Sequence, residues 1–373
     1  MRKEADDMKI SGIKIENNNL FEDLSISFLD ENTNEPHNVV LLVGENGKGK
    51  TTVLRSIASC FTINNHLYGG DILDFNNVSN NMDFGSIAID TMMNEEEVSC
   101  LGEFDKYEFY QYIVKKNGIE KNSNTLEKYN SFDLLDSNNQ YITPNILRMN
   151  GQFSNKSYEG SLILFFDVFR ILPKLEINGP NSSNLPSSPK ENSLAPSIRT
   201  QSIIERFQYT KQWLVNLDYK EAKLYREKNG QDSGLMIEVV RALNALFSPY
   251  EFSRITGKSK IMFKTPKGEV DIDDLSDGMK SVFTIIGEML FRFSMPYMDL
   301  DAIDIKAILN TEAIVLIDEI DCHLHPKWQL NIIPSLRGLF PNVQFIITTH
   351  APLVVSSVYP DEVYQLKETE EGN

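Results

Sequence analysis

The chain has little of what stabilises secreted or membrane-spanning proteins. Its 373 residues include only three cysteines, and no two of them form a CxxC pair. Scattered thiols argue against a disulfide framework and are typical of a reducing compartment. No apolar segment of a signal peptide opens the chain, and no run reaches the roughly 18 apolar residues of a membrane-spanning helix. The sequence therefore predicts a soluble, cytoplasmic protein without a membrane partner.

The chain also lacks a surplus of positive charge. Lysine and arginine number 36 against 53 aspartates and glutamates, which gives a net charge of −17. This balance disfavours a broadly basic nucleic-acid surface, although a local basic groove is compatible with it. Internal repeats and sustained heptads are not visible either. With 41% hydrophobic residues, the chain can still form one large α/β domain with an insertion, or two domains.

The most informative stretch is Val39 to Thr52, VVLLVGENGKGKTT. Its β-branched apolar run predicts a buried strand, and the following loop completes the phosphate-binding pattern G-x-x-x-x-G-K-[ST]. Backbone N–H groups of such a loop surround phosphate oxygens, Lys50 reaches the terminal phosphates and the Thr51 hydroxyl binds Mg²⁺. The predicted ATP-binding residues of this loop are Gly44, Glu45, Asn46, Gly47, Lys48, Gly49, Lys50, Thr51 and Thr52.

Two later apolar runs end in polar residues. Residues 313–319 read AIVLIDE, and residues 343–350 read VQFIITTH. Ligands bind beyond the carboxyl ends of parallel strands, so Asp318 is predicted to hold Mg²⁺ and Glu319 to activate the attacking water. His350 is predicted to contact the γ-phosphate or that water. A solvated strand end is the alternative for the carboxylates, and a structural histidine is the alternative for His350.

A third motif, LSDGMKS at residues 275–281, opens an amphipathic helix. Ser276 is a favourable N-cap, and Gly278 allows close approach of the backbone to a ligand. The motif fits an ordinary capped helix. It also fits a second anion site, made of a helix N-terminus, a serine hydroxyl and a glycine amide.

Four residues after the 313–319 run raise the question of a zinc site: Asp321, Cys322, His323 and His325. Near-consecutive residues lack the independent geometry that a metal needs, and no second ligand cluster appears, so zinc is not predicted. His325 and Pro326 are instead expected to start the next helix.

Taken in order, GENGKGKT, LSDGM, VLIDE and TTH resemble the ABC-type ATPase heads of the SMC and RecF class. Residues 316–358 are in addition similar to ATP-binding proteins of bacterial defence islands, such as Septu-type ATPases, and to OLD-family heads. The resemblance covers about residues 9–60 and 270–360. It implies an α/β P-loop fold, in which a mixed sheet with an antiparallel lobe is flanked by helices.

The resemblance also implies how the motifs cooperate. In that class two ATP molecules lie between the subunits of a head-to-tail dimer, so Ser276 and Gly278 would bind the ATP of a second copy. Lys50, Glu319 and His350 would be the catalytic groups of a Mg²⁺-dependent ATPase.

Three departures from the family pattern stand out. Met279 replaces a usual glutamine or aromatic residue, and Lys48 replaces a small residue. The glutamine of the Q-loop has no clear counterpart.

The chain is expected to divide into a head of residues 1–114 and 235–373 and a variable, partly helical insertion or lid of residues 115–234. The insertion is expected to contain a strand at 161–172, a mobile loop at 178–197 and a helical arm within 199–228. In the head, the further elements expected are strands at 9–15, 24–29, 84–90 and 107–114, a helix from Thr51 to about Phe61 and a helix at Leu235–Phe247.

The resulting prediction is a nucleotide-gated dimerising switch that controls a separate effector, such as a nuclease, in bacterial anti-phage defence. Only a short tail follows His350, so the effector is expected on another polypeptide. The alternative is an SMC/RecF-like repair ATPase that grips nucleic acid with its insertion, which leaves nucleic acid open as a partner. A transporter subunit fits least, because residues 51 and 275 are too far apart for a compact head.

Overall fold

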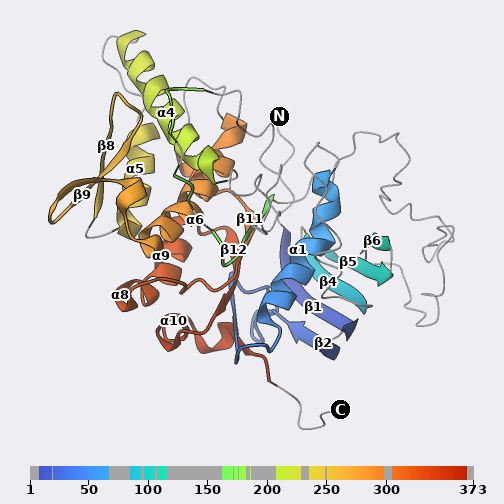
Figure 1. The fold of residues 1–373 in the computed structure, drawn as a ribbon. Coiled ribbons are helices and arrows are strands. Elements are labelled where there is room, and N and C mark those ends of the chain that lie inside the picture. The colour runs from blue at the N-terminus through green and yellow to red at the C-terminus, as the bar shows by residue number, and fades with distance from the viewer. Residues whose placement is uncertain are drawn as a thin grey trace. The chain divides into compact units, whose positions relative to one another are not determined.

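The computed structural model describes the following residues (Figure 1): 8–18, 20–66, 85–93, 96–105, 108–115, 162–170, 172–174, 176–181, 185, 207–227, 235–247, 250–297 and 305–367. By their contacts they belong to two units. The first unit comprises Met1–His37, Asn46–Ser161 and Glu368–Asn373, and the second comprises Asn38–Glu45 and Leu162–Lys367. Residues 116–161 and most of the predicted loop at 178–197 lie outside the described residues.

The first unit contains an antiparallel sheet with the order β2-β1-β4-β5-β6. Its strands are β1 (Met8–Asn18), β2 (Phe21–Ser27), β4 (Gly85–Met93), β5 (Glu96–Asp105) and β6 (Glu108–Lys115). The four strands expected in this part of the chain are confirmed, whereas β5 was not expected. In β1 a register shift between Ile10 and Gly12 moves the alternation by one residue, so Met8, Ile10, Ile13 and Ile15 are all buried.

Helix α1 (Lys50–His66) also belongs to the first unit. It is longer than predicted, since it continues past Phe61 to His66. No glycine or proline interrupts the sequence before Gly69, so nothing in the local sequence stops the helix earlier.

The second unit is built on a parallel sheet with the order β13-β3-β12-β11-β7. The strands are β3 (Val39–Val43), β7 (Leu162–Phe166), β11 (Ala313–Ile317), β12 (Val343–Thr349) and β13 (Val363–Gln365). Every residue of β7, β11 and β12 is buried. Continuous apolar runs of this kind are typical of parallel strands that are covered on both faces.

Strand β7 lies within the range of the predicted insertion. It was expected within the 115–234 insertion, yet it pairs with β11, and Leu164 lies opposite Val315. The predicted insertion therefore supplies a strand of the parallel sheet. The strand is also shorter than the predicted 161–172. It ends at Phe166, and a turn follows at residues 168–169, where the N–H of Phe169 donates to Oδ1 of Asp167 at 2.9 Å.

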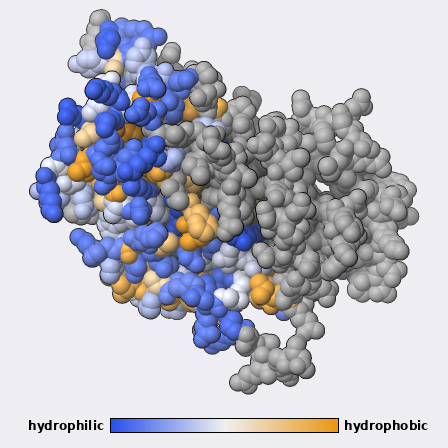
Figure 2. All heavy atoms as spheres, in the orientation of Figure 1, coloured by the Kyte–Doolittle hydropathy of each residue, from blue (hydrophilic) through white to orange (hydrophobic). Residues whose placement is uncertain are grey.

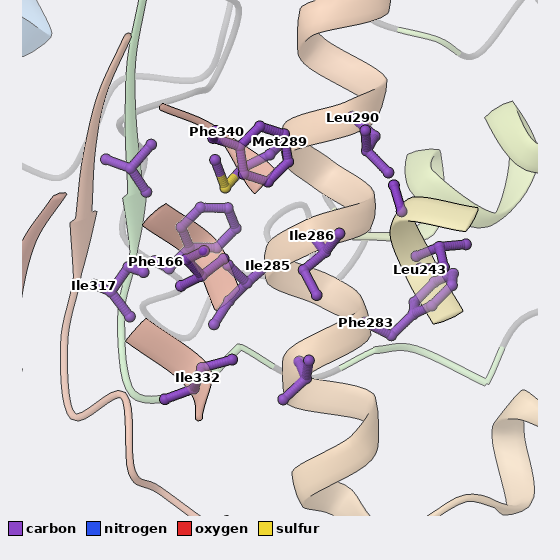
Figure 3. Packing of buried hydrophobic residues seen from close by; sticks show 14 of the residues in the cluster. Phe166, Leu243, Phe283, Ile285, Ile286, Met289, Leu290, Ile317, Ile332 and Phe340 are labelled. Atoms are coloured by element: carbon purple, nitrogen blue, oxygen red, sulfur yellow. The ribbon is translucent and has the colours of Figure 1, made fainter. Parts of the chain in front are cut away.

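Helix α6 (Asp277–Ser294) lies at the centre of the second unit and is buried almost all round from Met279 onwards. Figure 3 shows Ile285 and Met289 on the side of Phe166 and Phe340, and Phe283 on the side of Leu243. The other helices of this unit are α4 (Gln208–Glu227), α5 (Leu235–Phe247), α7 (Ile305–Leu309), α8 (Pro326–Gln329), α9 (Ile332–Leu339) and α10 (Pro352–Val355). The helix predicted at Leu235–Phe247 is confirmed.

Helix α4 is the described part of the predicted arm, and it packs against α6. A Cβ atom at Gly287 would overlap the methyl group of Thr210, so glycine lets the two helices approach closely. The Thr210 hydroxyl donates a 2.8 Å hydrogen bond to Glu288, whose other oxygen accepts from Arg292 at 2.9 Å. The arm is thus fastened to the core of the second unit.

A small antiparallel sheet that was not predicted precedes α6. Its strands are β8 (Glu251–Ile255), β9 (Ile261–Thr265) and β10 (Gly268–Asp271), in the order β10-β9-β8. Phe263 is buried and packs against Phe247 and Phe283. Figure 2 shows mainly hydrophilic residues over the outer surface of α4 and of this sheet. No helix among the described residues is long and apolar enough to cross a membrane.

Candidate active site

The parallel sheet brings the ends of the predicted motifs to one edge. Strand β12 lies between β3 and β11, and all three run in the same direction. Gly44 follows β3, His350 follows β12 and Asp318 follows β11, so all three residues lie at the carboxyl edge of the sheet. Asp167 joins them, because it follows β7 on the other side of β11. Ligands of open parallel sheets bind at this edge.

The glycines of the phosphate loop meet different needs of the backbone. A Cβ atom at Gly44 would lie 2.8 Å from the carbonyl oxygen of Leu366, which follows β13 and donates its N–H to Val43 at 2.8 Å. Gly47 and Gly49 have φ angles of +79° and +82°, which side chains with a Cβ rarely adopt. A Cβ atom at Gly47 would meet open space, whereas one at Gly49 would overlap the ring of Phe21.

The helix that follows the loop begins as the motif predicts. Lys50 is the first residue of α1 and is buried, and the N–H of Val53 donates to the carbonyl oxygen of Gly49 at 2.9 Å. Glu45, Asn46 and Gly47 are exposed, whereas Lys48, Thr51 and Thr52 are half-buried. Glycines in the left-handed region before a 17-residue helix form a suitable cradle for phosphate groups.

Asp318 and Glu319 are fixed by one hydroxyl group. Thr348 of β12 donates from Oγ1 to Oδ1 of Asp318 at 2.6 Å, and Oγ1 of Thr348 accepts the N–H of Glu319 at 2.7 Å. Asp318 is only 2% exposed, and its N–H donates to Phe166 at 2.8 Å. A held carboxylate is the kind of hard oxygen ligand that Mg²⁺ prefers, so Asp318 fits its predicted role.

Glu319 has an unusual backbone. Its φ angle is +44°, in the left-handed region, where a residue with a Cβ stores about 1–3 kcal/mol of strain. Its carbonyl oxygen accepts from Nη2 of Arg170 at 2.8 Å and from the N–H of Cys322 at 2.9 Å. Such strain persists only where the surroundings hold the residue, and it is frequent at functional sites.

Arg170 was not among the predicted site residues, although its side chain contacts Ser281 of the LSDGMKS motif and the backbone of Asp318 and Glu319. Its side chain is buried, and its Nη1 donates to the carbonyl oxygens of Asp167 at 2.8 Å and Asp318 at 2.6 Å. Burial lowers the pKa of Arg170, and the neighbouring Cys322, Asp167, Asp318 and Asp321 oppose that shift. A lone arginine four residues after an apolar strand was the available signal.

The LSDGMKS motif at residues 275–281, called the signature motif from here on, begins a helix as predicted. Ser276 is the N-cap of α6, is exposed, and accepts the N–H of Met279 at 3.4 Å. Gly278 has a structural reason to be glycine, because a Cβ atom there would overlap the carbonyl oxygen of His323. Met279 is buried in the core of the second unit.

Of the residues considered for zinc, Asp321 and His325 accept hydrogen bonds from neighbouring groups of the chain. Asp321 accepts hydrogen bonds from the Thr349 hydroxyl and, at 3.3 Å, from the N–H of His350. His325 is the N-cap of α8 and accepts the N–H of Lys327 at 3.3 Å, so the predicted helix start at Pro326 is confirmed. The His350 side chain is exposed at the sheet edge.

A parallel sheet with a glycine-rich G-x-x-x-x-G-K-T loop after one strand, and a buried aspartate after a second, defines a P-loop nucleoside triphosphatase. The motifs follow one another in the order GENGKGKT, LSDGM, VLIDE and TTH. The chain belongs to the family described as "AAA domain, putative AbiEii toxin, Type IV TA system", whose sequence profile matches residues 39–356.

Similar proteins carry names from bacterial defence systems. The chain is 26% identical to "Retron Vc95 probable ATPase" of Vibrio cholerae serotype O1 biovar El Tor, over 95% of this chain and 74% of that protein. It is 26% identical to "Septu protein PtuA" of Bacillus mycoides (strain KBAB4), over 97% of this chain but 41% of that protein. Among solved structures, the SMC head domain from Thermotoga maritima matches with a TM-score of 0.44 and 13% identity, over 96% of this chain and 94% of that one.

Proposed function

We propose that this protein is a Mg²⁺-dependent ATPase that acts as a nucleotide-gated dimerising switch and controls a separate effector in bacterial anti-phage defence. One observation carries the enzymatic part. Thr348 and Arg170 fix the backbone on both sides of Glu319, and Thr348 also holds Asp318, at the sheet edge where the phosphate loop begins. A purely structural strand end needs no such arrangement of two carboxylates.

Each predicted residue has a role in this proposal. The loop from Gly44 to Thr52 binds the triphosphate, with Lys50 on its terminal phosphates. Thr51 and Asp318 hold Mg²⁺, which neutralises phosphate charge when it is bound. Glu319 orients the attacking water and accepts its proton.

His350, at the end of the strand between the phosphate loop and Asp318, contacts the γ-phosphate or the attacking water.

The dimer is proposed from the other half of the site. Ser276 is exposed at the N-terminus of α6, an 18-residue helix, whereas Gly278 is buried against its own chain. A helix N-terminus with an exposed serine suits the binding of phosphate oxygens. In the proposed head-to-tail dimer, Ser276 and the amide of Gly278 complete the ATP site of the second copy.

The role in defence rests on the relatives. A retron ATPase and a Septu protein each match nearly the whole of this chain, although the chain spans only 41% of the Septu protein. The effector, for example a nuclease, is proposed to be a separate polypeptide encoded nearby. Co-expression of the chain with its neighbouring reading frames should protect bacteria in a plaque assay, and Lys50→Ala should remove that protection.

Glu319→Gln tests the ATPase. Because the amide cannot accept a proton, phosphate release should fall to background, while ATP binding persists through Lys50 and Thr51. The ATP-bound variant should accumulate as a dimer in size-exclusion chromatography with light scattering. An unchanged rate of phosphate release would refute the role of Glu319.

Mixing two inactive variants tests the shared site. Ser276→Arg blocks the signature loop, and Lys50→Ala disables the phosphate loop. A mixed dimer has one site in which both parts are intact, so the mixture should regain partial activity that neither variant has alone. Mixtures that stay inactive although mixed dimers form would argue against a shared site.

Described surfaces do not favour the alternative of a nucleic-acid grip. On the small sheet, Arg254 pairs with Glu269 at 2.9 Å, and Lys260 pairs with Asp271 at 3.2 Å. On α4, Lys223 lies 3.8 Å from Glu227. Alternating charges of this kind are typical of a solvated face.

A further inference from the structure

Arg170 joins three segments that are far apart in the sequence. It lies four residues after the end of β7, and its side chain is 3% exposed. Its Nε donates to Oγ of Ser281 in α6 at 2.7 Å, while Nη1 and Nη2 donate to the carbonyl oxygens of Asp318 at 2.6 Å and Glu319 at 2.8 Å. One guanidinium group thus binds both α6 and the segment after β11.

The shape of the guanidinium group suits this task. Its planar fork presents donors in a fixed geometry, so it can bind two successive carbonyl oxygens, those of Asp318 and Glu319. A lysine offers a single compact ammonium group and cannot reproduce this pattern. Burying a charge is unfavourable, and apolar residues fill a core at least as well. The contacts of Arg170 therefore indicate a role beyond packing.

The bond to Glu319 affects the direction of its side chain. The peptide groups on either side of a residue set the direction of its Cα–Cβ bond. At Glu319 the N–H is held by Thr348 and the carbonyl oxygen by Arg170, and the φ angle between them is +44°. Without Arg170, the Glu319 carbonyl oxygen keeps the hydrogen bond from the N–H of Cys322 but loses its side-chain partner, so the strained backbone is freer to relax and the carboxylate to turn.

The other end of the link lies near Ser276. Ser281 is five residues further along, in the second turn of α6. The close approach of Gly278 to the carbonyl oxygen of His323 joins the same two segments independently. The beginning of α6 and residues 318–323 are therefore held together at two places.

We infer that Arg170 is a positioning residue that aims the carboxylate of Glu319 and couples it to the Ser276 end of α6. This inference rests on the proposed ATPase function. In the proposed dimer, Ser276 and Glu319 of one chain serve different ATP molecules. When Ser276 binds ATP at one site, Arg170 then couples this binding to the orientation of Glu319, which activates water at the other site.

Two variants test the two halves of this role. Arg170→Lys keeps the charge but loses the fork, so kcat should fall about 10–100-fold, as it does when partners of catalytic groups are removed. KM for ATP and the affinity for a fluorescent ATP analogue should stay within a few-fold of wild type. Ser281→Ala removes only the bond to α6, so it should keep most of kcat but lose the cooperative dependence of the rate on ATP.

Arg254→Lys is the matched control, because it changes an exposed arginine that is paired with Glu269 on the small sheet. It should leave kcat, KM and cooperativity unchanged. Thermal unfolding of each variant measures the folded fraction, and if Arg170→Lys does not fold, Ser281→Ala alone decides. Wild-type kcat in folded Arg170→Lys, or wild-type cooperativity in Ser281→Ala, would overturn the inference.

The two proposals fail in different ways. If the wild-type protein does not hydrolyse ATP, or if its hydrolysis does not depend on Glu319, the proposed function itself is contradicted. An active wild type whose rate and cooperativity do not depend on Arg170 or Ser281 contradicts only the inference about positioning.

Discussion

The hydroxyl group of Thr348 donates a 2.6 Å hydrogen bond to Oδ1 of Asp318, across neighbouring strands of the parallel sheet. The Oγ1 atom of Thr348 also accepts a hydrogen bond from the N–H of Glu319. Thr348 therefore fixes the predicted metal ligand and the predicted base together. Both bonds are local consequences of the pairing of β12 with β11.

Thr348→Val should impair catalysis without unfolding the protein. Valine has the same shape but removes both hydrogen bonds, and the buried N–H that loses its acceptor costs about 1–3 kcal/mol of stability. We expect kcat to fall about 10–100-fold and half-maximal activity to need more Mg²⁺. Phosphate release measured over a Mg²⁺ titration checks this, with Thr348→Ser as the control that keeps the hydroxyl. Equal Mg²⁺ dependence of the valine variant and wild type would contradict the prediction.

Glu319→Gly should be more stable than Glu319→Ala, and both variants should lose hydrolysis. Glycine adopts a φ angle of +44° without strain, whereas Glu319→Ala loses the carboxylate but keeps the strain. We expect the glycine variant to unfold with a free energy about 1 kcal/mol higher than the alanine variant, the reverse of the usual order. Urea denaturation of both variants measures the difference. A more stable alanine variant would mean that the backbone here is not strained.

Gly278→Ala and Gly338→Ala should have opposite effects. A Cβ atom at residue 278 would overlap the carbonyl oxygen of His323, whereas nothing lies within 4 Å of a Cβ atom at residue 338 in α9. The first substitution should destabilise the protein by about 1–3 kcal/mol, and the second should stabilise it by about 0.5–1 kcal/mol. Thermal unfolding measures both, and a harmless Gly278→Ala would contradict the close packing.

Cys322 should react more slowly with alkylating reagents than an unfolded thiol. Burial raises the pKa of Cys322, partly opposed by Arg170. The folded protein therefore holds this proton more tightly, and the contribution to stability is present below the ordinary thiol pKa and is lost as pH rises through the folded value. The test uses a protein in which Cys60 and Cys100 are replaced by serine. The rate of iodoacetamide labelling rises with pH, and the midpoint of this rise should lie at a higher pH in the folded protein than in the protein unfolded in urea. A folded midpoint at or below the one in urea would disprove the shift.

Much of the second unit could be predicted because its strands are buried on both faces. The runs at 39–43, 313–317 and 343–349 are continuous and apolar, so their strands and the polar residues after them were visible locally. The start of α6 was equally clear, since the N-cap Ser276 is a local signal.

The rest depends on partners that are distant in the sequence. Strand β7 looked like part of an insertion, because nothing in its own sequence specifies pairing with β11. The small sheet of β8, β9 and β10 was not foreseen, since its strands have only four or five residues each. Arg170 has carbonyl oxygens as its main partners, and every residue carries one, so its position after an apolar strand was a signal that did not reveal its partners.

The strand order also determines when β3 can first pair with its neighbours during synthesis on the ribosome. Both neighbours of β3, namely β12 and β13, come late in the chain, so the strand that carries the phosphate loop has no partner in its sheet for most of translation. At about 5–20 residues per second, the roughly 300 intervening residues take about 15–60 s. During that time the run VVLLV is an apolar segment without a strand neighbour and a natural target for chaperones. Premature termination before β12 then yields a chain with the phosphate-loop sequence but without the sheet that supports it.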